Sequence, residues 1–591
     1  MDFDRWKQGE LIFPCIFMPF EYNETMLNFH NLDKISHHYS YMQSLLGEKQ
    51  FFFVWGMIRD LLLNRETNMD DVDITMWWNP TDIKWLIHSS RQKELFSFFD
   101  TEKYGTMTVI PKQDYSKDSG RVAEWDKDYE TLTTIKLCHS TQYEITPFRT
   151  ETTYSDGRHP DEVVRSNSLL EDSKRRDFTI NCLYYTRVSE WHSSMVAENS
   201  FDTKKVLDIL EKQWRFFDEY SHTLIVQQHD IIQQLQDNMQ SLQQYSQSVT
   251  HLIIDPHHGI QDLLNKKIRA VWLPDQRFQE DSLRLIRALR FAITLECDLH
   301  KDTRNSLKKN AYLIRQVAKE RIKQELDKVF KGNNPFGFVA LLDEANMLKW
   351  IFPKLYDNKN VNQPVRYHPF DVYTHSMMVL YHMQRLSTDY MLRYAALYHD
   401  VGKVEQYSSY AMNLDTEWLR EIFSSRLNHP VCGAEFTHTD FRALGFSNKE
   451  LDMLERYIRR HMKPGEILNG DLHNQRKKTR KLIAEVGPEM TKNLCTLTIA
   501  DRLGQYNPLQ APELDSVYDM IDLVDSLMAE EWRFTIKQLA VDGNRLMKQL
   551  WLTPWPKIGE LLSEIFERVS DNIADRNKSE VISEWLRGKP L

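Results

Sequence analysis

The stretch that decides the fold is GMIRD at residues 56–60, followed by DDVDIT at residues 70–75. The second segment is typical of a loop that leads into a β-strand. Side chains in a strand repeat every two residues, so Asp71 and Asp73 would project from the same face. Two carboxylates on one face can hold a pair of Mg²⁺ ions, which is an arrangement suited to phosphoryl transfer. An isolated Asp-x-Asp is more often a solvated turn or a helix cap, so the surrounding sequence has to decide between these readings.

Short strand-like runs, mixed with helical segments, surround this acidic pair. These runs are Phe51–Trp55, Val72–Met76, Met107–Ile110 and Tyr143–Thr146. They predict a small α+β domain with a mixed sheet at residues 34–185, after an N-terminal extension at residues 1–33. The rest of the chain is predicted to be almost wholly helical.

A Gln-rich stretch at residues 186–252 is predicted to form a long helix or a helical hairpin. Its apolar residues follow alternating four- and three-residue steps. The residues on these steps are Leu224, Ile231, Leu235, Leu242, Tyr245, Val249 and Leu252. Because Gln228 and Asn238 occupy the same seam, we favour an amphipathic helix packed on its own domain over an oligomerising coiled coil.

The remaining helical part divides into three domains. Pro353 and Pro364 mark a linker between a neck at residues 253–355 and a domain at residues 365–510. A boundary near Pro508 to Pro512 precedes a C-terminal helical domain at residues 511–591. This division agrees with the length of 591 residues, which predicts about three or four domains.

Composition narrows the class of protein. Hydrophobic residues make up 41% and charged residues 27%, as in globular proteins. The net charge of −10 argues against coating nucleic acid by bulk electrostatics, so any contact with nucleic acid would have to be local. Six widely spaced cysteines, an acidic N-terminus and the lack of a long apolar run predict a cytoplasmic protein with reduced thiols. Basic runs lie at residues 174–176, 266–269, 459–463 and 476–481, and each alone is more often a solvated helix face.

Three further segments identify the acidic pair as part of a known head domain. They are YEITPFR at residues 143–149, YSDGRHP at residues 154–160 and RRDFTIN at residues 175–181. Together with residues 56–60 and 70–75, they resemble in order the motifs of class II tRNA CCA-adding enzymes and bacterial poly(A) polymerases. This nucleotidyltransferase resemblance implies template-independent addition of nucleotides to RNA.

The resemblance assigns roles to individual residues of the head. It implies that Asp71 and Asp73 bind catalytic Mg²⁺, with Glu144 as a third catalytic carboxylate. It implies that Gly56 and Arg59 form a triphosphate loop. The nucleotide-binding residues that it implies in the RRDFTIN segment are Arg176, Asp177 and Asn181.

The neck extends the resemblance through DPHHGIQDL at residues 255–263, EDSLRLIRALRFA at residues 280–292 and KERIKQEL at residues 319–326. Asp281 and Arg284 stand three apart, so we expect them on one helical face with Arg287. Their acceptors and donors could pair with a base edge and select ATP and CTP. The alternative is a surface ion pair worth under about 1 kcal/mol.

Two features depart from the family pattern. Trp55 stands where the family has the first Gly of a pair, and Trp denies the close backbone approach to phosphate that Gly permits. About thirty residues, Pro111 to Gln142, enlarge the loop between the two catalytic strands, and the Gln-rich stretch is inserted after Asn181. Both insertions could alter how RNA is handled.

A second group of candidate ligands lies at HPFDVYTH, residues 368–375, at LYHDVGK, residues 397–403, and at IADR, residues 499–502. Imidazole and carboxylate ligands suit a divalent metal such as Mn, Ni, Mg, Zn or Fe, and such a metal supports phosphoester hydrolysis. The pattern resembles an HD phosphohydrolase domain. The resemblance implies primary metal ligands at His375, His399, Asp400 and Asp501. Around His429 and His461 the chain resembles HD domains fused to bacterial CCA-adding enzymes, which allows a second metal.

The sequence therefore favours CCA addition to a tRNA or other RNA 3′ end, with ATP and CTP as co-substrates and phosphatase or 2′,3′-cyclic phosphodiesterase activity in the HD domain. No membrane or obligate protein partner is expected. Three alternatives stay open: a poly(A) polymerase or A-adding enzyme, an inactive RNA-binding head with an active HD domain, and an HD hydrolase of signalling nucleotides.

Overall fold

The computed structural model divides the chain into two compact units, Met1–Glu325 with Gly337–Trp350, and Leu326–Phe336 with Ile351–Leu591. Each unit is described by itself. The residues that the structure describes are 27–46, 51–54, 56–65, 70–76, 84, 96–101, 106–111, 141–151, 163–187, 217–218, 223–227, 229, 250–363, 370–404, 429–505, 512–531, 539–550, 557–569 and 578–587.

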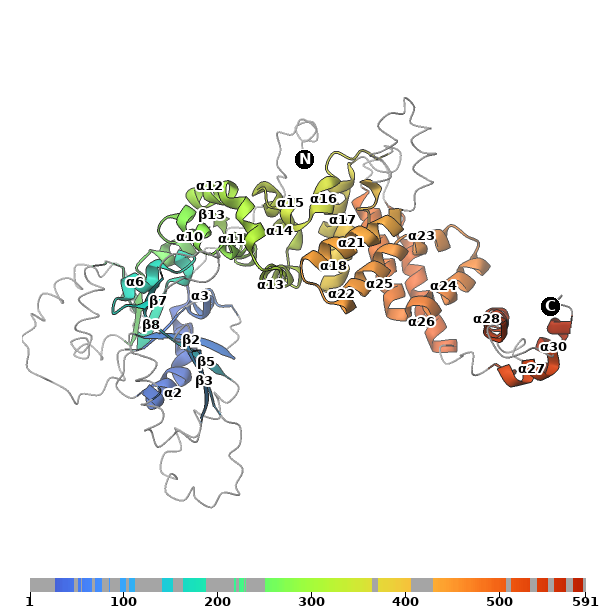
Figure 1. Ribbon diagram of the computed structural model, residues 1–591, viewed down its shortest axis with the longest axis horizontal. Helices are drawn as coiled ribbons and strands as arrows, with labels where there is room; N and C mark the ends of the chain where they lie inside the picture. Colours follow the sequence, from blue (N-terminus) through green and yellow to red (C-terminus); the bar gives the residue numbers. More distant parts are fainter. Residues whose placement is uncertain are drawn as a thin grey trace, which may run out of the picture. The chain divides into compact units, whose positions relative to one another are not determined.

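A mixed sheet forms most of the N-terminal part of the first unit (Figure 1). Its strand order is β3-β4-β5-β2-β1-β8-β11-β10-β9. The bounds are β1 Phe52–Phe53, β2 Asp71–Met76, β3 Phe96–Thr101, β4 Thr106–Pro111, β5 Gln142–Pro147, β8 Tyr184–Arg187, β9 Phe217–Asp218, β10 Thr223–Val226 and β11 His251–Ile254. The four predicted strand-like runs all fall in strands of this sheet, at β1, β2, β4 and β5. The two central strands β2 and β5 run parallel, whereas β1 and β4 flank them antiparallel.

The apolar face of the central strands is covered by the helix α2 (Ser36–Leu46). Val72 and Ile74 of β2 and Tyr143 of β5 are buried, because alternate residues of a strand point to opposite faces. The ring of Tyr143 stacks on Tyr41 of α2 at 5.2 Å between ring centroids. The opposite face of β2 and β5 is left with the polar residues of both strands.

The prediction of a helix in the Gln-rich stretch is wrong for its first and last seam residues, which lie in strands. Leu224 and Leu252, which the periodicity placed on one helical seam, are paired residues of the parallel strands β10 and β11. Short apolar runs such as TLIV at residues 223–226 do not distinguish a strand from a buried helix by periodicity alone. The seam positions from Ile231 to Val249 lie outside the described residues.

Helices follow the sheet in the first unit. They are α9 (Gly259–Leu264), α10 (Pro274–Glu280), α11 (Leu283–Thr294), α12 (Lys301–Asn310), α13 (Lys319–Phe330), α14 (Pro335–Glu344) and α15 (Leu348–Ile351), of which α13, α14 and α15 also include residues of the second unit. Their connections include a two-stranded sheet of β12 (Lys267–Ile268) and β13 (Asp298–Leu299). This arrangement confirms the predicted fold class of an α+β head followed by helices.

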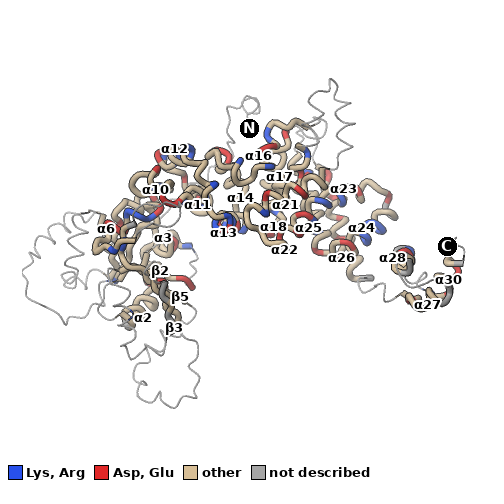
Figure 2. Tube along the Cα trace, in the orientation of Figure 1, with Lys and Arg blue, Asp and Glu red and all other residues tan. Residues whose placement is uncertain are grey.

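The second unit is helical within the described ranges. Its main helices are α16 (Pro353–Asp357), α17 (Val372–Leu386), α18 (Tyr390–Tyr398), α21 (His429–Ala443), α22 (Asn448–Arg460), α23 (Lys463–Leu468), α24 (Leu472–Val486), α25 (Pro488–Gly504) and α26 (Asp515–Glu531). Pro353 occupies the first turn of α16, so the predicted linker begins as helix. Figure 2 shows the basic run at residues 476–481 on α24.

The C-terminal helices α27 (Gly543–Leu550), α28 (Lys557–Val569) and α30 (Ser579–Arg587) share a small apolar core that includes Leu546, Ile565 and Ile582. Among the helices that the structure describes, none is both long enough and apolar enough to cross a membrane.

Candidate functional sites

The register of β2 and β5 brings three carboxylates onto one face of the head sheet. Asp73 pairs with Glu144 across the parallel strands, and Asp71 pairs with Gln142. Asp71 is exposed, whereas Asp73 and Glu144 are half-buried. The sequence predicted that Asp71 and Asp73 share a face, and the alternating burial of β2 agrees with that prediction.

These carboxylates are electrostatically crowded. Burial, together with the charges of Glu144 and Asp71, raises the pKa of Asp73 to about 7, although Arg176 opposes the shift. Burial and the charge of Asp71 also raise the pKa of Glu144. Like charges in a partly dry site disfavour one another, and a hard divalent cation with oxygen ligands relieves that repulsion. The donor set therefore fits Mg²⁺.

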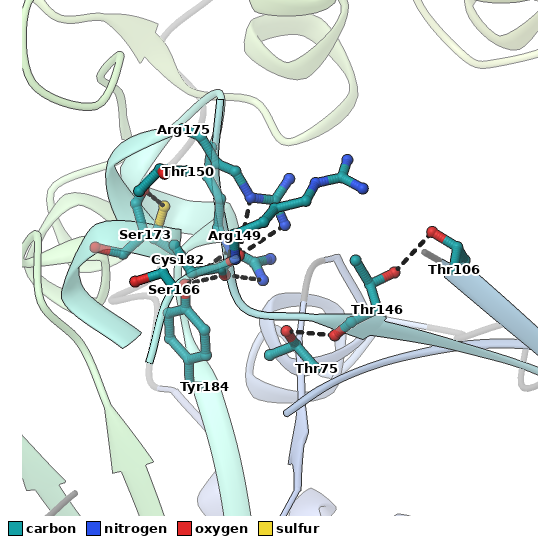
Figure 3. A network of polar contacts seen from close by, with 12 residues as sticks. Thr75, Thr106, Thr146, Arg149, Thr150, Ser166, Ser173, Arg175, Cys182 and Tyr184 are labelled. Carbon is teal, nitrogen blue, oxygen red and sulfur yellow. Dashed lines mark hydrogen bonds and ion pairs between the residues drawn. The ribbon is translucent and has the colours of Figure 1, made fainter. Parts of the chain in front are cut away.

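Hydroxyl groups continue the same face toward the other end of the strands. The Thr75 hydroxyl donates to the Thr146 carbonyl oxygen at 2.9 Å, and the hydroxyl oxygens of Thr106 and Thr146 lie 3.5 Å apart (Figure 3). These bonds tie β2, β4 and β5 together beside the carboxylates.

Arg59, predicted for a triphosphate loop, is engaged by protein partners. It is 6% exposed and donates to both carboxylate oxygens of Asp60, at 2.8 and 2.7 Å, and to Asn181 Oδ1 at 2.6 Å. A Cβ at Gly56 would lie 2.9 Å from the Arg59 guanidinium, which leaves little room for a side chain where α3 (Gly56–Leu62) begins. The unusual Trp55 lies outside the described residues.

Arg176 lies in the interior of the head. It is 1% exposed, and its guanidinium pairs with the fully buried Asp172 at 3.0 Å and donates to the Tyr184 hydroxyl at 2.9 Å. Asp172 also accepts from Arg175 at 2.8 Å (Figure 3). Burial alone would raise the pKa of Asp172, but Arg175 and Arg176 lower it to about 2. Asp172 lies in α6 (Leu169–Lys174), and Arg176 follows directly after the C-cap of this helix. We did not single out Asp172 in the sequence, although it stands one helical turn before Arg176.

The remaining predicted residues of this segment form a network with one another. Asp177 accepts two bonds from Arg287, at 3.0 and 2.7 Å, and one from the Asn181 amide at 3.0 Å. Asn181 in turn accepts from Arg59. The structure thus brings Arg59, Asp177, Asn181 and Arg287 together, and in this arrangement their polar groups satisfy each other.

The prediction that Asp281 and Arg284 share one helical face is wrong. Asp281 has extended backbone between α10 and α11, because the chain leaves the helix at Glu280 and re-enters it at Leu283. Asp281 accepts two bonds from Arg321, at 3.1 and 3.0 Å. Arg284 instead donates to Glu280 at 3.0 Å and to the Arg175 carbonyl oxygen at 2.6 Å.

In the second unit, capping residues place the predicted ligands. Asp371 caps α17 by accepting from the Thr374 amide at 2.8 Å, so His375 sits in the first turns of the helix. Ser447 and Glu450 form a capping box that begins α22, which ends directly before His461. His429 begins α21, His399 follows the last residue of α18, and Asp501 lies in α25.

Three of these ligands form a first buried group. His375 Nε2 lies 3.3 Å from His399 Nε2 and 3.0 Å from Asp501 Oδ1. His399 Nε2 lies 3.8 Å from the same Asp501 oxygen. Within the described part of the chain, Asp501 Oδ1 is buried without a hydrogen-bond partner of good geometry, which is rare for a carboxylate oxygen. The three donor atoms can hold one metal ion.

Asp400 connects this group to a second one. Its Oδ1 lies 3.3 Å from His429 Nε2 and 3.7 Å from His461 Nε2, and those two ring nitrogens are 3.3 Å apart. Its Oδ2 lies 3.5 Å from His375 Nε2 and 3.3 Å from His399 Nε2. One carboxylate therefore faces both groups, each of which can hold a metal ion.

The second ring nitrogens of His399 and His461 support metal binding by these two residues. His399 Nδ1 lies 2.9 Å from the Ala396 carbonyl oxygen, and His461 Nδ1 lies 2.7 Å from the Ile458 carbonyl oxygen. A carbonyl only accepts, so Nδ1 carries a proton and Nε2 can offer its lone pair to a metal. Burial lowers the pKa of His399, but Asp400 and Asp501 outweigh it and raise the pKa to about 10, so a proton competes with metal there.

Close backbone packing makes the second group possible. A Cβ on Gly402 would lie 2.1 Å from the His429 carbonyl oxygen and 2.6 Å from the Gly433 amide nitrogen. Only a glycine lets the turn after Asp400 approach the start of α21 this closely. Lys403 pairs with Asp400 at 2.5 Å and donates to Gln363 at 2.8 Å, which orients the bridging carboxylate.

Comparison with known proteins matches three family models. They are the poly(A) polymerase head domain at residues 112–209, a probable RNA- and SrmB-binding site of polymerase A at residues 298–358, and the HD domain at residues 372–504. The CCA-adding enzyme of Ligilactobacillus salivarius is 32% identical over 48% of this chain and 46% of its own length. That of Enterococcus faecalis is 30% identical over 51% of this chain and 50% of its own length. The chain thus spans about half the length of these curated relatives.

A solved structure shares the fold. The Bacillus stearothermophilus CCA-adding enzyme in complex with CTP superposes with a TM-score of 0.51, at 20% identity, over 94% of this chain and 97% of its own. At that identity the likeness shows the fold alone.

Proposed function

Since the chain is related to CCA-adding enzymes and contains a poly(A) polymerase head domain and an HD domain, we propose that it adds CMP and AMP to the 3′ ends of tRNA. In this reaction the RNA 3′-hydroxyl attacks the α-phosphate of CTP or ATP, and pyrophosphate leaves. The observation that carries the proposal is the register of β2 and β5, which places Asp71, Asp73 and Glu144 on one face.

Different residues of the chain are assigned to the metal, the triphosphate and the nucleotide. Asp71 and Asp73, with Glu144, would hold Mg²⁺, which supplies charge stabilisation to the transferring phosphoryl group. We assign the triphosphate to the region of Gly56 and Arg59, and the nucleotide to the neighbouring RRDFTIN segment and α11. Arg176 acts from the interior and holds this segment in place through Asp172.

Base recognition by Asp281 and Arg284 requires an exchange of partners. Asp281 would give up Arg321, and Arg284 would give up Glu280, when the base edge of CTP or ATP takes their place. Asp177, with Asn181 and Arg287, would position Arg59 and the start of α11 for that nucleotide. The carboxylate and guanidinium groups that a protein template needs are thus present. In the structure they are paired with other side chains of the protein.

A tRNA transcript without its CCA terminus tests the proposal. Purified protein is incubated with this RNA and with labelled CTP or ATP, singly and together. We expect two C residues from CTP alone, and A only when CTP is also present. Long A tails from ATP alone would establish the poly(A) alternative instead, and absence of incorporation by a protein that binds the transcript would support an inactive head.

A second candidate function rests on the HD site. We propose that His375, His399, Asp400 and Asp501, with His429 and His461, hold one or two divalent metals that supply Lewis acidity toward a phosphate ester. The shared Asp400 carboxylate is the observation that favours it. RNA ending in a 2′,3′-cyclic phosphate and RNA ending in a 3′-phosphate are the substrates to test, each with Mn²⁺, Ni²⁺, Mg²⁺, Zn²⁺ or Fe²⁺. Release of phosphate from free nucleotides, without action on RNA ends, would favour the signalling hydrolase.

We place these reactions in the cytoplasm, with RNA as the macromolecular partner. Each cysteine in the described ranges, Cys182, Cys297, Cys432 and Cys495, is free. Unpaired thiols suit a reducing compartment.

A further inference from the structure

Trp272 combines two properties that folding alone does not favour. Its side chain is 58% exposed, and its backbone φ is 60°, in the left-handed region. Bulky side chains rarely adopt this conformation, because the Cβ atom crowds the backbone. An exposed ring gains little from burial to offset the strain. Strained residues of this kind cluster at ligand sites.

The position of Trp272 is set by the RRDFTIN segment. The Val271 amide donates to the Asp177 carbonyl oxygen at 3.1 Å, and the Thr179 amide donates to the Arg269 carbonyl oxygen at 3.0 Å. These bonds hold residues 269–271 against the segment proposed to bind the nucleotide. Trp272 follows directly, before α10 begins at Pro274.

A cation and an apolar side chain accompany the ring. The Lys174 ammonium lies 5.4 Å from the centroid of the Trp272 ring, while it also pairs with Glu171 at 2.6 Å. The Lys174 carbonyl oxygen accepts from Arg277, which fixes the end of α6 beside this loop. Leu273 is 51% exposed. The surface therefore offers an aromatic ring, an apolar edge and a cation whose present partner is Glu171.

We propose that Trp272 and Lys174 form a stacking platform for a nucleobase near the 3′ end of the RNA substrate. An aromatic ring stacks on a base without regard to its identity, and the Lys174 ammonium would exchange Glu171 for the adjoining phosphate. The base of the incoming nucleotide is expected at Asp281 and Arg284, which are not part of this platform. The inference rests on the proposed RNA nucleotidyl transfer.

Two substitutions of Trp272 separate stacking from folding. Asn tolerates a positive φ but has no ring, whereas Phe keeps a ring. We expect Trp272→Asn to raise the Kd for a tRNA transcript lacking CCA about tenfold. The KM for CTP and the Tm should stay unchanged, or the Tm should rise as strain is relieved. Trp272→Phe should retain near-parental RNA affinity. Tyr518→Ala, which removes a 47% exposed aromatic side chain from α26, is the matched control. It should change neither the Kd for RNA nor the KM for CTP.

The possible results are distinct. A Trp272→Asn protein with an unchanged Kd for RNA overturns the platform, even while CCA addition by the parent upholds the proposed function. A raised KM for CTP with unchanged RNA affinity would place the ring under the incoming base and overturn the RNA assignment. Equal losses in Trp272→Phe and Trp272→Asn would exclude stacking. A parent that extends no RNA would remove the proposed function itself.

Discussion

The two candidate sites hold their ligands in different ways. In the head, Asp71 and Asp73 lie on one short strand and Glu144 on its parallel neighbour, half-buried or exposed. In the HD site, six candidate ligands come from α17, α21 and α25 and from the residues that follow α18 and α22, and four of the six are buried. An open carboxylate face suits ions that arrive with a nucleotide, whereas a closed cluster of imidazoles suits ions that remain with the protein.

The largest expected effect comes from removing one ligand at each site. Asp73→Asn should lower nucleotide incorporation about 10³-fold, or ~4 kcal/mol in transition-state stabilisation, because the Mg²⁺ proposed for the head would lose a carboxylate ligand. Asp400→Asn should abolish HD hydrolysis to a similar degree. Incorporation and phosphate release are measured on both variants.

Each of these variants is the control for the other. The difference between the sites predicts that Asp73→Asn leaves phosphate release intact and Asp400→Asn leaves incorporation intact. Undiminished incorporation by Asp73→Asn would remove the metal assignment in the head.

The next effect concerns the buried ion pair of Asp172 and Arg176 in the head. Asp172→Asn leaves the guanidinium of Arg176 buried without its anionic partner, so the free energy of unfolding of the head should fall by about 3–5 kcal/mol. Thermal and denaturant unfolding measure the loss. Lys463→Ala breaks the exposed Lys463–Glu466 pair and should cost under about 1 kcal/mol. Similar losses in both variants would contradict the role given to burial.

A smaller effect is expected at the turn that joins the two HD groups. Gly402→Ala forces its Cβ into the His429 carbonyl oxygen, which should displace α21 and cost about 1–3 kcal/mol. Metal content after gel filtration should fall for the group of His429 and His461 and remain for that of His375 and His399. Gly465→Ala, whose Cβ would meet open space, is the matched control. Full metal content in Gly402→Ala would argue against the two-metal arrangement.

The smallest effect tests the pairing of Asp281. Arg321→Gln keeps the polarity of the side chain but removes the charge that holds Asp281. Because this pair is partly exposed, we expect only a few-fold change in the KM for CTP and ATP, with unchanged stability. Steady-state kinetics with each nucleotide measure it. Unchanged KM values for both CTP and ATP would show that Arg321 does not restrain Asp281 in nucleotide binding.

The sequence supported some parts of the site more directly than others. The alternation of strand β2 was sufficient to predict that Asp71 and Asp73 share a face, because that geometry is local. The helical spacing of Asp281 and Arg284 was misleading, since the chain leaves the helix at Asp281 and no nearby Gly or Pro signals the break. Asp172 could have been found from its helical spacing to Arg175 and Arg176, whereas the pairing of Arg321 with Asp281 joins two distant segments and depends on the tertiary structure.

Local sequence by itself determined the α+β head, the acidic strand and the motifs of the HD domain, because strand alternation and helix caps depend on neighbouring residues. Only the tertiary structure decided that Leu224 and Leu252 lie in strands, that Asp400 joins two ligand groups, and that Trp272 is exposed with a positive φ. Those outcomes depend on which distant segments meet, and the free energy of packing them is not encoded at any single position.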